Sequence, residues 1–102
     1  MKHKILASTL VAWVLWSNAK PPDKPEGWVR ISATETKRAC EEEQAAMVRS
    51  LHSAAERMKP GPENRDGTIE RTPIGTVERT PAGAMRTWFL FQCWPDTVDP
   101  SR

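Results

Sequence analysis

The sequence predicts an α+β domain in which a small antiparallel sheet of about four or five strands carries one long helix on one face, in the order ββαβββ. Three observations support this prediction. Two alternating segments flank a proline-rich connector near the start, a stretch with helical spacing follows, and a repeat with turn residues precedes the most apolar part of the second half. A chain of 102 residues has room for one domain, which we place at residues 13–102.

The first alternating segment, Trp13 to Trp16 (WVLW), has two interpretations. Lys2 and Lys4 make the start basic and an apolar run follows, which is typical of a secretory signal peptide. The signal covers residues 1–12 if WVLW is a strand of the mature domain, and residues 1–19 if cleavage comes later. The apolar run is shorter than the roughly 20 residues that cross a bilayer. We therefore expect a periplasmic or secreted protein with no stable membrane insertion after processing.

The second alternating segment is Trp28 to Thr34 (WVRISAT). It follows the connector KPPDKPEG, which its prolines exclude from a helix or a central strand. Alternation predicts a half-buried strand, with Val29, Ile31 and Ala33 on one side and Trp28, Arg30 and Ser32 on the other.

The helix is predicted from Thr36, a residue that favours the N-cap, to about Lys59. One stripe, mostly apolar, repeats at intervals of four and three residues and comprises Cys40, Gln44, Met47, Leu51, Ala54 and Met58. Such a stripe is wide enough to pack on a sheet. The sequence Pro60-Gly61-Pro62 ends the helix, because proline cannot continue it.

Two copies of an eight-residue repeat, IERTPIGT and VERTPAGA, predict a three-stranded meander. In Thr-Pro-x-Gly, proline suits the first central position of a type I turn, and glycine suits the left-handed residue of a three-residue hairpin loop. The strands are expected at Thr68–Thr72, Thr76–Thr80 and Ala84–Cys93. The last strand is the most apolar, so we place it centrally or against the helix, with Phe89, Phe91 and Cys93 facing the core.

Charge and motif content exclude several function classes. The 15 basic and 13 acidic residues differ only by Lys2 and Lys4, so the domain is neutral and offers no electrostatic footprint for nucleic acid. After the N-terminal segment His52 is the only histidine, too few for a zinc site or a catalytic triad. Asp96 and Asp99 are expected to cap a proline-bounded turn rather than to act as paired carboxylates. We expect no enzyme, no cofactor and no metal site.

Cys40 and Cys93 are the two cysteines of the chain. One falls in the first turn of the predicted helix and the other at the end of the strand that packs against it. We expect a structural disulfide, which small exported domains commonly need. The alternative is thiol–disulfide redox activity, because thiols at helix N-termini are reactive. The absence of a C-x-x-C motif weighs against that alternative.

One surface is a candidate for binding a protein or peptide partner. Trp88, Arg30 and Arg86 are expected on the sheet face away from the helix, where a tryptophan among arginines forms a platform for a ligand. The alternatives are that Trp88 covers an otherwise bare face, or that the C-terminal tail folds back onto it. The sequence does not identify the partner.

Three stretches resemble a family of small, uncharacterised exported bacterial proteins: AWVLW, a W…AT…C stretch before the helix, and the ending CWPDTVDPSR. That family has a WVLW N-terminal strand and a C-terminal C-x-PDTVDPR motif, whereas here Ser101 stands before the final Arg102. The resemblance covers residues from Ala12 onward. It implies that WVLW is the first strand, paired as a hairpin with Trp28–Thr34, and that the signal ends near Ala12.

The resemblance implies no activity. The first function hypothesis is therefore a non-enzymatic exported accessory or interaction domain, stabilised by one disulfide. The second is a thiol–disulfide redox protein that uses Cys40 and Cys93.

Overall fold

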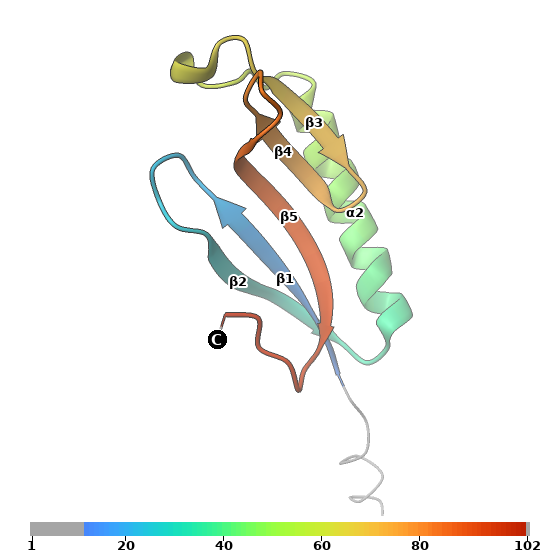
Figure 1. The fold of residues 1–102 in the computed structure, drawn as a ribbon. Helices are drawn as coiled ribbons and strands as arrows, with labels where there is room; N and C mark the ends of the chain where they lie inside the picture. The colour runs from blue at the N-terminus through green and yellow to red at the C-terminus, as the bar shows by residue number, and fades with distance from the viewer. Residues whose placement is uncertain (1–11, 102) are drawn as a thin grey trace, which may run out of the picture.

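The computed structural model describes residues 12–101, so most of the expected signal segment lies outside the described residues. The elements in chain order are β1 (Trp13–Lys20), β2 (Gly27–Thr34), α2 (Lys37–Ala55), the short 3-10 helix η1 (Pro62–Asn64), β3 (Thr68–Thr72), β4 (Gly75–Arg79) and β5 (Met85–Pro95). The strands form one antiparallel sheet in the order β2-β1-β5-β4-β3, and α2 packs on one face of it (Figure 1). The predicted fold class is confirmed.

WVLW lies in β1, one of the inner strands of the sheet. β1 pairs antiparallel with β2 from Trp13 opposite Thr34 to Ala19 opposite Gly27. On its other side it pairs with β5 over its whole length. The expected N-terminal hairpin is therefore present, and β1 has neighbours on both sides.

The predicted alternation of β2 is wrong at one point, because the strand contains a bulge. Leu15 pairs with Ser32 and Trp16 pairs with Arg30, so Ile31 has no partner in β1. Consecutive residues of β1 point to opposite faces, and so must Ser32 and Arg30. The sequence pattern had placed these two residues on the same side.

Helix α2 begins where the sequence predicts. The Thr36 side chain accepts a hydrogen bond from the Ala39 amide at 3.0 Å, as an N-cap does. The helix ends at Ala55, earlier than the predicted Lys59. The amides of Arg57 and Met58 bond back three residues, which tightens the last turn and turns the chain away before Pro60.

The two repeats form different turns. In the second copy the Gly83 amide bonds to Thr80 O at 2.8 Å and Gly83 has φ +93°, as the predicted loop requires. In the first copy the prediction is wrong, because Gly75 already belongs to β4 and pairs directly with Thr72. A Cβ atom at Gly75 would lie 2.0 Å from Phe89 O, so glycine is needed there for close approach.

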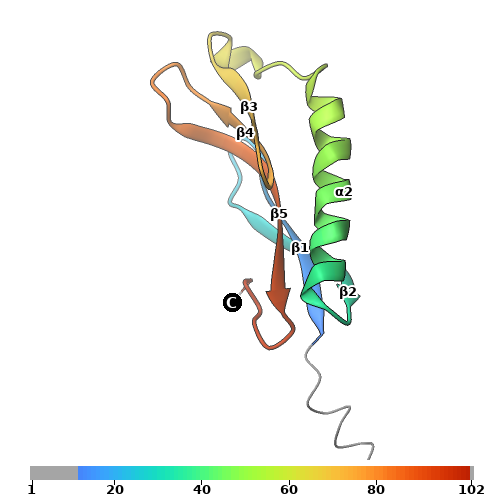
Figure 2. The ribbon, with the colours of Figure 1, turned by 90° about the vertical axis from the view of Figure 1, so that its right-hand side faces the viewer.

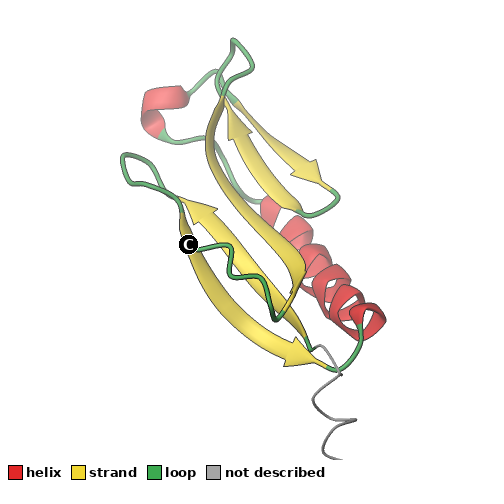
Figure 3. Cartoon of the chain, turned by 60° about the horizontal axis from the view of Figure 1, so that its bottom comes forward, coloured by secondary structure: helices red, strands yellow, loops and turns green. Residues whose placement is uncertain are grey.

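β5 is the central strand and links two hairpins (Figure 3). Its second half, from Trp88 to Pro95, pairs with β1, while β4 pairs with its first half up to Leu90. The sheet is therefore two staggered hairpins joined along one long strand. Its upper end, with β3 and β4, leans away from the axis of α2 (Figure 2).

Register assigns each strand residue to one of two faces, because directly paired residues point to the same side. Leu15 lies opposite Cys93, which is bonded to α2, so both belong to the helix face. The other face carries four of the chain's five tryptophans, and we call it the tryptophan face: Trp16, Trp28, Trp88 and Trp94. The segment after β5 turns back on this side of the sheet (Figure 2).

Candidate functional site

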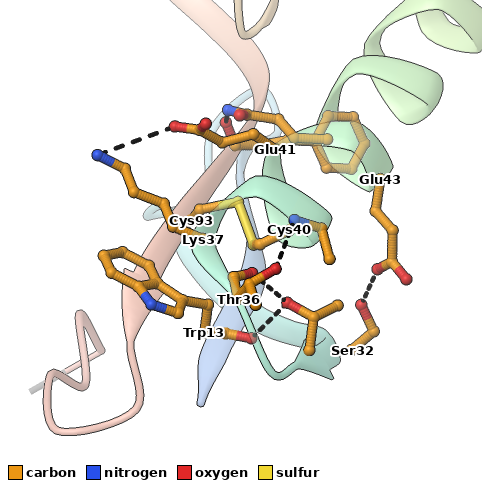
Figure 4. The surroundings of a disulfide bond; sticks show 12 residues. Trp13, Ser32, Thr36, Lys37, Cys40, Glu41, Glu43 and Cys93 are labelled. Atoms are coloured by element: carbon orange, nitrogen blue, oxygen red, sulfur yellow. Dashed lines mark hydrogen bonds and ion pairs between the residues drawn. A yellow bond between two sulfur atoms is a disulfide. The ribbon is translucent and has the colours of Figure 1, made fainter. Parts of the chain in front are cut away.

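The disulfide fastens one end of α2 to the sheet. Cys40 in the first turn of the helix bonds to Cys93 on β5, with 6.1 Å between the Cα atoms. Cys40 is 0% exposed. Figure 4 shows the bond beside Thr36 and Trp13, with the Lys37 ammonium 5.7 Å from the Trp13 ring centre. The expected pairing of the two cysteines is present in the structure.

The packed core lies around this disulfide. Its buried members come from β1, α2 and β5 and are Leu15, Cys40, Val48 and Phe91. Gln44 strengthens the same end, because its Nε2 donates to Phe91 O at 2.7 Å. The helix and the sheet are thus packed tightly against each other along the first part of α2.

A groove opens at the other end of the same interface. It has a volume of about 510 Å³ and lies between the end of α2, the upper part of the sheet and the loop after β1. Three groups of residues line it: Leu51, Met58 and Lys59 from α2 and its turn; Ala19, Lys20, Pro21 and Pro22 from β1 and its loop; Ile69, Thr76, Glu78, Thr87, Trp88 and Phe89 from the remaining strands. Most of this lining is apolar.

Phe89 marks the boundary between core and groove. It is on the helix face with Phe91, and the two ring centroids are 5.2 Å apart. Phe91 is 4% exposed, but Phe89 is 41% exposed. The predicted orientation of Phe89 is right, but its ring is left partly exposed at the groove.

One end of the groove carries a satisfied carboxylate, that of Glu78. Its oxygens accept hydrogen bonds from Asn64 Nδ2 (2.8 Å), Arg86 Nη1 (3.1 Å), Thr87 Oγ1 (3.2 Å) and the Gly61 amide (3.3 Å). Burial alone would raise the pKa of Glu78, but the bonds from Asn64 and the other donors outweigh it, so the pKa lies below its ordinary value. Glu78 therefore ties η1 to β4 and β5.

The candidate surface of Trp88, Arg30 and Arg86 is not assembled as one patch. Trp88 lies on the tryptophan face, where its Nε1 donates to Asn18 Oδ1 at 2.5 Å. Arg30 lies on the same face but on β2, with β1 between the two. Arg86 is held by Glu63 at 2.7 Å and by Glu78 at 3.1 Å, beside η1.

The tryptophan face is covered largely by its own side chains. Trp16 and Trp28 meet edge to face with 6.5 Å between ring centroids, and Trp16 is 9% exposed. Within the described residues, the indole N–H groups of Trp16 and Trp94 are buried without a hydrogen-bond partner. This packing agrees with the alternative that the tryptophans cover an otherwise bare sheet face.

His52 and Asp99 both have structural hydrogen bonds. His52 Nε2 lies 2.9 Å from Thr72 O and 3.0 Å from Gly75 O, which fixes α2 to the β3–β4 turn. Asp99 Oδ1 accepts from the Ser101 amide at 2.9 Å, as expected for a turn cap. Asp96 is joined to the start of β1 through its amide, which bonds to Ala12 O.

Between residues 12 and 101 no group of three or more His, Cys, Asp or Glu side chains is placed to hold a metal ion. The groove lining, as far as it is described, has no cysteine or histidine. No helix in this part of the chain is long and apolar enough to cross a membrane.

Comparison with family models, with curated proteins and with solved structures found no significant match to this chain.

The groove was not predicted from the sequence. Its apolar residues, such as Leu51, Met58 and Phe89, follow the same periodicities as the core residues. The one signal in the sequence is that the predicted stripe runs on to Met58, two residues before Pro60, where a helix is expected to end.

Proposed function

We propose that this protein is an exported, non-enzymatic binding domain whose ligand occupies the groove between α2 and the sheet. The observation that carries the proposal is the asymmetry of the helix–sheet interface. It is closed by a disulfide and a buried cluster at one end, and it is open as an apolar groove of about 510 Å³ at the other. Pockets that hold small molecules have volumes of about 300–1,000 Å³ and mostly apolar linings.

Export is supported by the disulfide, because such bonds persist in oxidising compartments. The position of β1 supports cleavage near Ala12 rather than after Ala19. Cleavage after Ala19 would remove a strand that pairs with both β2 and β5. The periplasm and the external medium both fit this proposal.

The buried position of Cys40 supports a structural role for the disulfide. Thiol–disulfide exchange needs an incoming thiolate to reach a sulfur atom. Cys40 has no exposed surface and sits within the packed cluster, and the half-buried Cys93 packs against that cluster, which restricts attack to one side of the bond. We therefore prefer a binding domain to a redox protein.

Spectra of the methionine methyl groups test the proposal directly. Met58 lines the groove, and Met85 is a matched control because it is similarly exposed, 46% against 42%, but lies outside the groove. We expect some members of a library of small apolar compounds to shift the Met58 signal while leaving that of Met85 in place. If no compound acts selectively on Met58, the groove is not a binding site and the proposal fails.

A further inference from the structure

Two lysines are among the residues that line the groove. Lys20, at the end of β1, and Lys59, in the turn after α2, both line it. Lys20 lies opposite Trp88 at the end of β1, and its Nζ donates to Pro21 O at 3.3 Å, which brings the ammonium back to the loop that borders the groove. In residues 12–101 neither ammonium is paired with a carboxylate.

The only acidic side chain in the described lining, that of Glu78, is held in a network of ion pairs and hydrogen bonds. Glu78 is 8% exposed and its carboxylate is ion-paired with Arg86, which lies outside the lining. Asn64 and Thr87 occupy further positions on its oxygens. Arg86 is shared with Glu63, so Glu63, Glu78 and Arg86 together carry one net negative charge. Lys20 and Lys59 outweigh it, and the net formal charge at the groove remains positive.

The apolar part of the groove suits a flexible hydrocarbon. Leu51, Met58, Ile69 and Phe89 supply aliphatic and aromatic surface that the fold leaves uncovered. A partly exposed methionine adapts to irregular apolar shapes. An apolar chain that enters the groove would remove this surface from water.

A peptide backbone fits the groove less well. Its amides and carbonyls need hydrogen-bond partners when they are buried. The groove segments of β4 and β5 already pair with each other, with Thr76 opposite Phe89 and Glu78 opposite Thr87. Pro21 and Pro22 on the loop have no N–H group to offer.

We propose that the groove binds a single-chain amphiphile with an anionic head group, of the free fatty acid type. The hydrocarbon chain lies between Met58 and Phe89, and the head group lies at the rim beside Lys20 and Lys59. This inference rests on the proposed function of the groove and adds the chemical class of its ligand. Charge complementarity at the rim selects the anion, and the apolar lining holds the chain.

The test compares two probes of equal chain length and opposite charge, dodecanoate and dodecyltrimethylammonium, below their micelle concentrations by titration calorimetry. We expect dodecanoate to bind at least about tenfold more tightly, since charge-assisted contacts are made only by the anion. The double change Lys20→Ala and Lys59→Ala should abolish the preference. Lys24 is exposed in the loop between β1 and β2 and does not line the groove, so Lys24→Ala should leave the preference for dodecanoate intact.

Met58→Glu locates the binding. It should reduce dodecanoate affinity at least about tenfold, because it places a carboxylate in the path of the anion and its chain. Met85→Glu is the matched control and should have no effect. Both residues are exposed, so neither variant is expected to unfold the domain.

The results distinguish a wrong ligand class from a groove that binds nothing. Equal binding of both probes, lost in Met58→Glu, overturns the anionic ligand but leaves the groove as a binding site. Failure of dodecanoate to bind, or binding that Met58→Glu does not change, overturns the fatty acid proposal. In either case the methyl-spectrum screen still decides on its own whether the groove binds other small molecules. Binding of acidic apolar peptides in place of dodecanoate would identify a different ligand class and also overturn the inference.

Discussion

Phe89 and Phe91 point to the same face of β5 with their ring centroids 5.2 Å apart, yet only Phe91 is buried. Phe91 packs with Leu15 and Val48 in the core, whereas Phe89 faces the groove. The boundary between the packed core and the open groove therefore falls between these two residues of β5.

Alanine substitutions at these positions should therefore behave differently. Phe91→Ala is expected to lower the free energy of unfolding by about 3–5 kcal/mol, because it leaves a cavity in the core. Phe89→Ala should cost about 1 kcal/mol or less, since its ring is already partly in water, and it should weaken ligand binding in the groove. Urea denaturation measures both. Equal destabilisation would show that Phe89 belongs to the core.

Loss of the disulfide should cost much of the stability of the domain. Cys40 and Cys93 close a loop with a sequence separation of 53. On the chain-entropy model such a loop contributes about 4 kcal/mol, against a total of about 5–15 kcal/mol for a typical domain. The double variant Cys40→Ala, Cys93→Ala should therefore melt far below the parent protein in calorimetry.

The reactivity of the disulfide distinguishes the structural role from the redox alternative. Because Cys40 is fully buried and Cys93 is only partly exposed, we expect mild reductant and an alkylating reagent to label the cysteines of the native protein slowly. Both cysteines should become labelled when denaturant is added. Labelling at similar rates with and without denaturant would favour the redox alternative instead.

Glu78 should make the stability depend on acid pH. Its folded-state pKa lies below the ordinary value of 4.5, so its contribution is present above pH 4.5 and is lost as the pH falls through the folded-state pKa. Glu78→Gln should lower the free energy of unfolding at neutral pH by about 2 kcal/mol, since bonds to a charged acceptor are lost. The difference from the parent should shrink in acid.

Glu70→Gln is the control for this effect. Glu70 pairs with Arg79 on the surface, where its side chain is 47% exposed. Surface ion pairs contribute about 1 kcal/mol or less. If Glu70→Gln lowered the free energy of unfolding as much as Glu78→Gln, with the same pH dependence, the hydrogen bonds from Asn64 and Arg86 would not be the source of the Glu78 effect.

The two repeat glycines should differ in their tolerance of alanine. A Cβ at Gly75 would meet the backbone of Phe89 and Leu90, so Gly75→Ala should cost about 3 kcal/mol by forcing the sheet apart. Gly83 has open space around it but a φ of +93°, so Gly83→Ala should cost about 1 kcal/mol of backbone strain. Thermal melts compare the two. Equal destabilisation by the two alanine substitutions would contradict the different environments of Gly75 and Gly83.

The fold followed from patterns that are local in sequence. Alternation, the Thr36 cap and the turn residues predicted the elements, and the position of Cys40 and Cys93 predicted their pairing. The bulge at Ile31 was not predictable, because its cause is the pairing with β1 and not the sequence of β2 itself.

The candidate site was predicted less well. The sequence pointed to Trp88, Arg30 and Arg86 on one sheet face, but Arg86 is engaged by the carboxylates of Glu63 and Glu78, which are distant in sequence. The groove depends on where α2 stops covering the sheet. That is a property of the tilt between helix and sheet, and residue periodicity does not report it.

The position of β1 leads to a last prediction, about the mature N-terminus. A chain that started at Lys20 would lack β1, leaving β2 without a partner and the second half of β5 unpaired on one side. We therefore expect the protein purified from an exporting bacterial host to begin near Trp13. Intact mass measurement before and after reduction and alkylation should also show two thiols that appear only on reduction. A mature start at Lys20 with a folded domain would contradict the position of WVLW on an inner strand of the sheet. Free thiols in an uncleaved chain would contradict export.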